Sequence, residues 1–361
     1  ANIKSDTPED AADLAEFLTG DGSANPNEGT DWAKLRIDSG LRDPVPVVTW
    51  ELGNEVEWSD SAKRMPLAEY IDRCRKTIAA IRAVHPSATF APHAATAPWA
   101  YKERFNEDWR EWHRTILREI GSDISCLAFH PYYFGYPTSL IEEYLNVIRD
   151  DIKVITGSDR VKIYISEHGL WPSQLKGQPW QKTWHTTHAL MGCLGTAQFI
   201  NRMYTRPDIG LSTYHCFSAG PWGMVYRGKQ TKKLYTTAIT DMFRLYNAAV
   251  GSHVLAATVS GDWTNPAQGD LSLTVTAMET KDGMNLILVN RESATKRLLS
   301  FAFRESYDLV RTERLTAPAM QSFNSEQEKR VVVSRSEDGV TNFSSYEMPE
   351  KSIVALYLKK R

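Results

Sequence analysis

Five short apolar runs alternate with helix-like segments along the first 250 residues of this 361-residue chain. The runs lie about 30–45 residues apart, around positions 45–52, 89–93, 124–130, 161–167 and 211–217. Helical patterns follow them at 67–84, 98–119, 140–155, 185–204 and 234–249. Strands separated by helix-length connections build parallel βαβ units. The spacing therefore predicts an α/β fold with a parallel sheet for residues 1–250.

Residues 1–44 precede the first of these runs. Ser5-Asp-Thr-Pro-Glu-Asp10 places a capping residue, a proline and acids at the start of a helical pattern, which continues to Leu18. These residues suit the first turn of a helix. Residues 21–44 are rich in Gly, Asn, Asp and Pro, and we expect a loop there.

The pattern changes near residue 250. Residues 251–361 carry short stretches of alternating apolar and polar residues, with turn signals at Asp282-Gly283 and Asp338-Gly339. Examples of the strands that we expect are 253–259, 271–277, 284–289, 298–303, 331–333 and 353–358. Short strands of this kind build antiparallel β-sandwiches. The chain is therefore expected to have two domains, 1–250 and a C-terminal antiparallel β-sandwich at 251–361.

Two of the predicted strands end in a glutamate with a tryptophan nearby. One reads Thr49-Trp-Glu-Leu-Gly-Asn-Glu55, and the other reads Ile165-Ser-Glu167-His-Gly-Leu-Trp171. The carboxyl ends of parallel strands meet at one edge, where β/α barrels build their active sites. A lone glutamate there is more often a helix cap or a solvated rim residue. Two such strand ends favour a functional pair of carboxylates.

A pair of carboxylates suits glycoside hydrolysis. One carboxylic acid protonates the leaving oxygen, and one carboxylate attacks the sugar or activates water. Asn54, beside Glu55, could hydrogen-bond a sugar hydroxyl, and Trp171 could stack on a sugar ring. His168 and Trp171 could also position Glu167. Aromatic side chains offer apolar faces to sugars, and Trp222 after the fifth run is a candidate platform.

These motifs resemble glycoside hydrolase family 51, the α-L-arabinofuranosidases. Trp50-Glu-Leu-Gly-Asn-Glu55 is similar to the acid/base strand of that family, and Ile165-Ser-Glu167-His-Gly resembles the nucleophile strand of its clan. The resemblance implies that Glu55 is the general acid/base and Glu167 the nucleophile of a retaining enzyme. It also implies a histidine and a tyrosine near the nucleophile. His130 matches the histidine, and of Tyr132 and Tyr133 we prefer Tyr132.

The resemblance further implies a (β/α)8 TIM-type barrel followed by the β-sandwich. The chain would then begin near the third barrel strand, so the N-terminal strands are missing from it. A cut or missing segment, or a second chain, is expected to supply barrel strands 1–3. The resemblance also implies a homo-oligomer, because many members of the family assemble as oligomers.

Composition and motifs exclude several other classes of protein. The net charge of −2 argues against a nucleic-acid binder, and no apolar run is long enough to span a membrane. No dinucleotide-binding, phosphate-binding or His-Glu-x-x-His motif occurs, so no cofactor and no metal are expected. His185 and His188 lie three residues apart but have no third ligand nearby in the sequence. The opening residues do not form a signal peptide, and the compartment stays open.

The sequence thus predicts a retaining glycoside hydrolase that removes α-L-arabinofuranosyl units from plant-type polysaccharides or oligosaccharides by double displacement. Two alternatives stay open. One is an endo-acting β-glucanase or xylanase of the same clan, because one barrel fold serves many activities. The other is a carbohydrate-binding subunit without turnover. The linkage cleaved, and exo or endo action, do not follow from the sequence.

Overall fold

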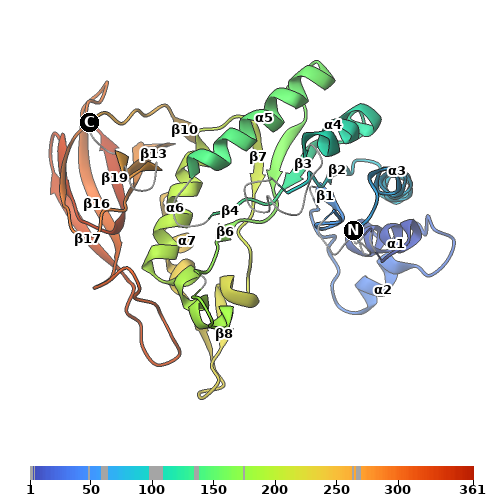
Figure 1. Cartoon of the computed structure of the whole chain (residues 1–361), viewed down its shortest axis with the longest axis horizontal. Coiled ribbons are helices and arrows are strands. Elements are labelled where there is room, and N and C mark those ends of the chain that lie inside the picture. Colours follow the sequence, from blue (N-terminus) through green and yellow to red (C-terminus); the bar gives the residue numbers. More distant parts are fainter. Residues whose placement is uncertain are drawn as a thin grey trace. The chain divides into compact units, whose positions relative to one another are not determined.

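The computed structural model describes residues 3, 5–47, 49–57, 64–96, 109–133, 138–173, 175–261, 264–265 and 270–361 (Figure 1). The chain divides into two compact units. The first consists of Ala1–Pro131, Glu143–Ser166 and Asp208–Ser212. The second consists of Tyr132–Glu142, Glu167–Pro207 and Thr213–Arg361. The predicted boundary near residue 250 stays a prediction.

The first unit is built on parallel strands that follow the order of the chain. They are β1 (Thr49–Leu52), β2 (Thr89–Pro92), β3 (Cys126–Phe129), β5 (Lys162–Ile165) and β7 (Ile209–Ser212). β1 pairs with β2, a parallel bridge joins His93 to Ala128, and β3 pairs through β5 to β7. The five predicted parallel strands are therefore present. The described strands do not close into a barrel, and Val48 of the first predicted run lies outside the described residues.

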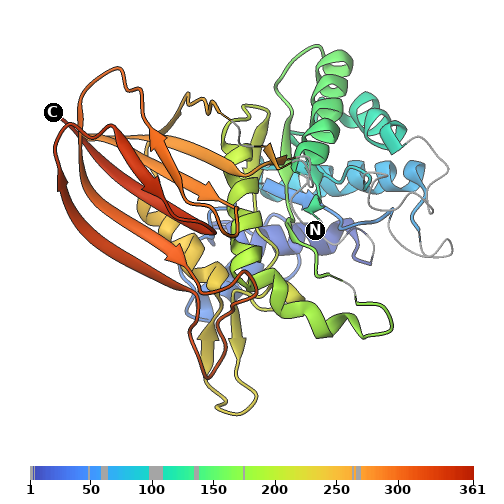
Figure 2. The ribbon, with the colours of Figure 1, turned by 60° about the vertical axis from the view of Figure 1, so that its left-hand side comes forward.

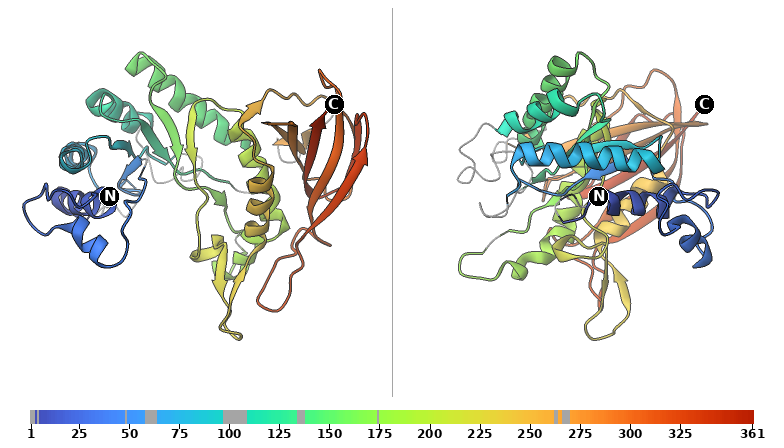
Figure 3. Two further views of the ribbon diagram at one scale, coloured as in Figure 1. Left: turned by 180° about the vertical axis from the view of Figure 1, so that it is seen from behind. Right: turned by 90° about the vertical axis from the view of Figure 1, so that its right-hand side faces the viewer.

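Helices cover this sheet. They are α1 (Pro8–Thr19), α2 (Trp32–Asp38), α3 (Leu67–Val84) and α4 (Trp109–Ile120), while α5 (Thr138–Thr156) spans both units. α1 begins at Thr7, whose hydroxyl accepts from the backbone of Asp10 while the Asp10 carboxylate accepts from Thr7. α1 packs against α2 and α3, as the blue ribbons of Figure 3 show. Residues 98–108 of the predicted helix 98–119 lie outside the described residues.

α2 corrects the expectation of a loop over residues 21–44. Its sequence has little apolar periodicity, and one buried cation stabilises the segment instead. Arg36 is 1% exposed and donates to the backbone carbonyls of Phe17, Gly20, Leu41 and Arg42. A buried guanidinium needs such partners, and carbonyl oxygens supply them here. An arginine normally indicates a surface position, so no pattern in the sequence predicts this helix.

Tyr70 of α3 fixes the carboxyl ends of β1 and β2 together. Its hydroxyl donates to the carbonyl of Leu52 at 2.5 Å and accepts from the backbone N–H of His93 at 2.7 Å. Trp112 of α4 stacks on Tyr70 at 5.6 Å and donates its indole N–H to the carbonyl of His93. These buried contacts define the backbone at the two strand ends that carry Glu55 and His93.

The second unit begins with the paired short strands β4 (Tyr132–Tyr133) and β6 (Gly169–Leu170). A 3-10 helix at Trp180–His188 leads into α6 (Leu190–Tyr204), and a hairpin of β8 (Val225–Arg227) and β9 (Leu234–Thr236) leads into α7 (Ala238–Ala249). The helix predicted from residue 234 therefore begins four residues later. Leu234–Thr236 pairs with β8 instead, and the Thr237 hydroxyl donates to the carbonyl of Gly223.

A six-stranded antiparallel sheet completes the second unit. Its order is β10 (His253–Leu255), β13 (Leu273–Thr280), β14 (Gly283–Asn290), β19 (Ser352–Lys360), β16 (Tyr307–Thr316) and β17 (Val332–Val340). Two-stranded sheets form from β15 (Arg297–Ser300) with β18 (Ser345–Met348) and from β11 (Thr264–Asn265) with β12 (Asp270–Leu271). Figure 2 shows α6 and α7 against one face of the large sheet. The sequence did not predict β16 and β18, and Asp338-Gly339 lies inside β17 rather than in a turn.

Separate apolar cores lie on the two faces of the large sheet. Residues of α6 and α7, such as Leu194 and Met242, pack with Ile287 and Ile353 on one face. Leu288 and Leu356 pack with Leu299 and Tyr346 from β15 and β18 on the other face. Burial on both faces explains the continuous apolar runs of β14 and β19. None of the described helices is long and apolar enough to cross a membrane.

Candidate active site

Glu55 lies in a tight turn that follows β1. Gly53 has φ +86°, and a Cβ added there would lie 2.9 Å from Cγ1 of Val56, so only glycine fits. Glu55 itself has φ +43°, a conformation that non-glycine residues rarely adopt. Such strain persists where the surrounding structure enforces it and often accompanies function. Asn54, between these two residues, is exposed.

A continuous line of hydrogen-bonded side chains joins Glu55 to β1. His130 follows β3, and its Nδ1 lies 3.1 Å from Oε1 of Glu55. The other ring nitrogen, Nε2, lies 2.9 Å from Oγ of Ser166, which follows β5. Ser166 donates to Oε1 of Glu51 at 2.5 Å. Three strands of the first unit thus contribute to one network at their carboxyl ends.

Glu51 is held as an anion in this network. Its burial alone would raise the pKa of the carboxyl group. Hydrogen bonds from His130 and Ser166 outweigh that effect, together with the nearby charge of His93, and lower the pKa below its usual value. The Glu51 side chain is 28% exposed, so it also reaches solvent.

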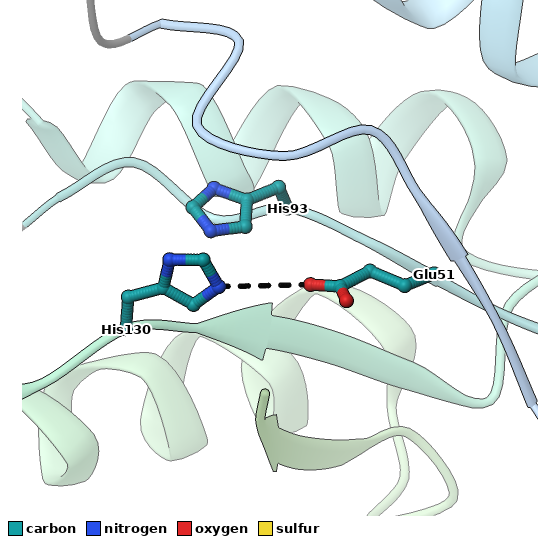
Figure 4. A group of neighbouring side chains, drawn as sticks. All are labelled: Glu51, His93 and His130. Atoms are coloured by element: carbon teal, nitrogen blue, oxygen red, sulfur yellow. Dashed lines mark ion pairs between the residues drawn. The ribbon is translucent and has the colours of Figure 1, made fainter. Parts of the chain in front are cut away.

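His93 and Glu57 form a buried layer beside this network. His93 is fully buried, and its ring lies edge-on to that of His130 at 4.3 Å. Its Nδ1 lies 3.5 Å from Oε2 of Glu57, whose Oε1 accepts from the backbone N–H and hydroxyl of Thr96. Burial would raise the pKa of Glu57, but the charge of His93 and these hydrogen bonds lower it. Figure 4 shows His93 and His130 beside Glu51.

Glu51, His93 and His130 could together hold a metal ion, because one ligand atom of each lies within 4.8 Å of the others. Imidazole and carboxylate are donors that suit zinc. However, Nε2 of His130 already lies at hydrogen-bond distance from Ser166, so coordination through it would break that contact. The reaction proposed below therefore uses no metal ion at these residues. His185 and His188 do not occur in a metal-ligand group among the described residues.

Glu167, the second candidate carboxylate, lies in the second unit, directly after Ser166 in the chain. Tyr132 donates its hydroxyl to Oε2 of Glu167 at 2.7 Å. β4 and β6 pair in parallel with Tyr132 opposite Gly169, which places the phenol beside the glutamate. His215 lies on the same side, with Nδ1 3.6 Å from Oε2 of Glu167. The Tyr132 hydroxyl and the His215 ring therefore face the same oxygen of Glu167.

An aromatic cluster packs around Tyr132, the partner of this carboxylate. The ring of Tyr132 lies 5.3 Å from that of Trp171 and 5.0 Å from that of Trp222, and Trp180 lies 5.5 Å from Trp171. Trp171 is partly exposed, whereas Trp222 is only 6% exposed. The indole N–H of Trp222 donates to the carbonyl of Leu170 at 2.8 Å. Trp222 is thus placed to support Tyr132 and Trp171, with little ring surface left for a sugar.

His168 does not contact the neighbouring carboxylate through any described hydrogen bond. It is 2% exposed and packs on Phe199 at 4.6 Å, with Nδ1 3.5 Å from the hydroxyl of Tyr133. Burial lowers the pKa of His168 to about 3, so the ring is neutral. Tyr133 itself is buried and donates to Thr196 at 2.9 Å. Of the two candidate tyrosines, the structure therefore places Tyr132 at Glu167.

Four residues near the carboxylates had not been singled out from the sequence. They are Glu51, His93, Ser166 and His215. Each lies in or just after a predicted parallel strand. A systematic survey of polar residues at all five strand ends could have found them, because those ends meet at one edge.

Sequence comparisons find arabinofuranosidases. An intracellular exo-α-(1→5)-L-arabinofuranosidase of Bifidobacterium longum is 22% identical over 210 residues, which cover 48% of this chain and 35% of that protein. An enzyme of the same description from Streptomyces lividans is 27% identical over 120 residues, covering 33% of this chain and 17% of that protein. The chain thus spans about a third or less of the length of these relatives. No protein-family model matches it.

Comparison of folds covers nearly the whole chain. The GH51 α-L-arabinofuranosidase from Thermotoga petrophila aligns with a TM-score of 0.79 at 16% identity, covering 98% of this chain and 74% of that one. Likeness at this identity establishes the fold. The chain therefore has the fold of the GH51 α-L-arabinofuranosidases, and the resemblance to glycoside hydrolase family 51 that its motifs indicate is confirmed.

Proposed function

We propose that this chain carries the catalytic carboxylates of a retaining α-L-arabinofuranosidase. The observation that carries the proposal is that each carboxylate has a partner suited to its role. Glu167 accepts a hydrogen bond from Tyr132 at 2.7 Å, and Glu55 faces a nitrogen of His130 at 3.1 Å. The phenol of Tyr132 can donate a hydrogen bond to Glu167, and the imidazole of His130 can share a proton with Glu55.

The reaction would proceed by double displacement. Glu167 attacks the anomeric carbon while Glu55 protonates the glycosidic oxygen, which gives a covalent glycosyl-enzyme and a free alcohol. Glu55, now ionised, then takes a proton from water, which attacks the same carbon and releases the sugar with its configuration retained. This mechanism requires the two carboxyl groups to lie roughly 5–5.5 Å apart in the working enzyme. It needs no cofactor.

Carbohydrate would bind around these groups. Asn54 is exposed beside Glu55, where its amide can reach a sugar hydroxyl. Trp171 offers a partly exposed ring beside Tyr132. The substrate proposed is a terminal α-L-arabinofuranosyl unit of a plant-type polysaccharide or oligosaccharide, which agrees with the names of the two sequence relatives.

We also infer that the five parallel strands belong to a (β/α)8 barrel. β1 and β7 each have one unpaired edge among the described strands, and exposed sheet edges are normally covered. Further strands, from a preceding segment or a second chain, would cover them. The mass of the native protein, measured before and after denaturation, tests this inference and the expected homo-oligomer. A single monomeric chain of 40.8 kDa would contradict both the second chain and the oligomer.

The function itself is tested with the full protein and 4-nitrophenyl α-L-arabinofuranoside. We expect turnover, a first product with retained configuration by proton NMR, and loss of turnover in Glu55→Gln and Glu167→Gln variants. Turnover of β-glucan or xylan without turnover of the arabinofuranoside would favour the endo-acting alternative. Binding of arabinan without turnover of any of these substrates would favour the carbohydrate-binding subunit.

A further inference from the structure

The hydrogen bonds between Glu51 and Glu55 can run in only one direction when Glu51 is ionised. An ionised carboxylate has no hydrogen to donate, so Ser166 must donate to Glu51 at 2.5 Å. The hydroxyl has one hydrogen, so Ser166 can only accept from Nε2 of His130 at 2.9 Å. Nε2 of His130 must therefore carry a proton.

The proton on Nε2 determines whether Nδ1 of His130, the atom that faces Glu55, carries a proton or a lone pair. A neutral imidazole carries one N–H, so with Nε2 protonated its Nδ1 presents a lone pair. Nδ1 lies 3.1 Å from Oε1 of Glu55. A lone pair facing an ionised carboxylate is repulsive, whereas one proton between the two atoms makes a hydrogen bond. The network thus favours the state in which Glu55 and His130 share a proton.

We propose that Glu51 and Ser166 are positioning residues that fix the tautomer of His130, so that Glu55 and His130 keep a shared proton available for the leaving group. This inference rests on the proposed function of Glu55. The negative charge of Glu51 acts in the same direction, because it favours a proton on the neighbouring imidazole.

Other titratable groups lie near His130. Within the first unit these are Glu51, Glu55 and His93, and Oε2 of Glu57 lies 3.5 Å from Nδ1 of His93. His93 packs against the ring edge of His130 and pairs with Glu57 through Nδ1, so it does not compete for either nitrogen of His130 in the described contacts. Ser166 at 2.9 Å and Oε1 of Glu51 at 3.7 Å both face Nε2 of His130, and both favour a proton on that nitrogen.

The test compares two substrates that differ in their need for a proton. Phenoxide departs slowly without protonation, while 2,4-dinitrophenoxide needs little help. We expect Ser166→Ala and Glu51→Gln to move the alkaline limb of kcat/KM for phenyl α-L-arabinofuranoside to lower pH, by about one unit for one lost hydrogen bond. For the dinitrophenyl substrate, kcat/KM at neutral pH should change less than about twofold.

Two control variants separate positioning from packing. Ser166→Thr keeps the hydroxyl and should restore the alkaline limb of the wild-type protein. Ser125→Ala removes a hydroxyl at the opposite end of the same sheet, where Ser125 donates to Phe90, and should leave the profile unchanged. Thermal melting of each variant establishes that it is folded.

An alkaline limb that stays in place in folded Ser166→Ala and Glu51→Gln would overturn the proposal. If Glu55→Ala meanwhile slows the phenyl substrate far more than the dinitrophenyl one, the proposed function of Glu55 stands without the relay. If Glu55→Ala slows neither substrate, the proposed function itself fails.

Nitrogen NMR of the wild-type protein gives an independent reading. With the His130 signal assigned by a His130→Gln variant, we expect the proton on Nε2 above the alkaline limb. A proton on Nδ1 in that pH range would overturn the proposal without any variant of the network.

Discussion

Tyr132 donates its hydroxyl hydrogen to Oε2 of Glu167 across 2.7 Å, and the rings of Trp171 and Trp222 pack against its own ring. A hydrogen bond to an ionised group is worth about 1.5–3 kcal/mol. We therefore expect Tyr132→Phe to lower kcat/KM for aryl arabinofuranosides by roughly 10–100-fold. The fold should be unaffected, because the aromatic ring stays.

Tyr133→Phe is the matched control for that variant. Its hydroxyl is buried and donates to Thr196 at 2.9 Å. We expect this variant to lose about 1 kcal/mol of stability and to keep kcat/KM within a few-fold. Equal losses of activity in both variants would show that the hydroxyl of Tyr132 has no special role.

The buried histidines predict how stability depends on pH. Burial lowers the pKa of His168 from 6.5 to about 3 and that of His188 to about 4. Below about pH 6.5 the unfolded chain takes up protons that the folded chain cannot. The folded state is therefore most stable, with respect to these histidines, above that pH. Its stability falls as the pH drops toward the pKa values that the histidines have in the folded state. Each such histidine lowers the free energy of unfolding by about 1.4 kcal/mol for each pH unit of acidification in this window.

We expect His168→Phe to reduce that loss. Phenylalanine fills a similar volume against Phe199 and takes up no proton. The drop in melting temperature between pH 7 and pH 5 should be smaller in the variant than in the wild-type protein. An equal drop in both would contradict the assignment of His168 as a neutral buried group.

Metal removal should leave activity unchanged. Both nitrogens of His130 lie at hydrogen-bond distance from protein groups, one from Glu55 and one from Ser166. Dialysis against EDTA, followed by assay with 4-nitrophenyl α-L-arabinofuranoside, measures this. Loss of turnover that zinc restores would instead indicate that the active protein holds a zinc ion.

Chemical rescue should separate the roles of the two carboxylates. In Glu55→Ala, azide can attack the glycosyl-enzyme on Glu167 without a general base, so we expect an azide product of retained configuration. In Glu167→Gly, azide can replace the nucleophile itself, so we expect inverted configuration. Proton NMR of the products distinguishes them. The reverse pattern would exchange the two assigned roles.

The sequence predicted most of the parallel part of the fold and missed features that depend on distant contacts. α3 was placed at Leu67–Val84 because Ile71, Ile78 and Ile81 repeat on one face. α2 was not predicted because a buried Arg36, with carbonyl partners outside the helix, takes the place of an apolar stripe. β16 was not predicted because Arg311 and Arg314 interrupt its apolar pattern. Their guanidinium groups lie against Tyr357 and Tyr346 from other strands.

The candidate site was predictable where a motif marked it. Strand ends with Glu55 and Glu167 are visible in the sequence, and so are His130 and Tyr132 after a third strand. The choice between Tyr132 and Tyr133 needed the structure, because neighbouring residues of a strand point to opposite faces. His215 was not predicted because no motif marks it. Its position opposite Glu167 follows from a backbone hydrogen bond between His215 and His168.

The central claim is that Glu167 is the nucleophile of an arabinofuranosidase. The most direct test is the initial rate at which Glu167→Gln hydrolyses 4-nitrophenyl α-L-arabinofuranoside, compared with the wild-type protein at the same concentration. Glutamine keeps the size of the side chain and removes its nucleophilic charge. We expect Glu167→Gln to turn over this substrate roughly 10⁴-fold or more slowly than the wild-type protein. A rate within tenfold of wild type would contradict it.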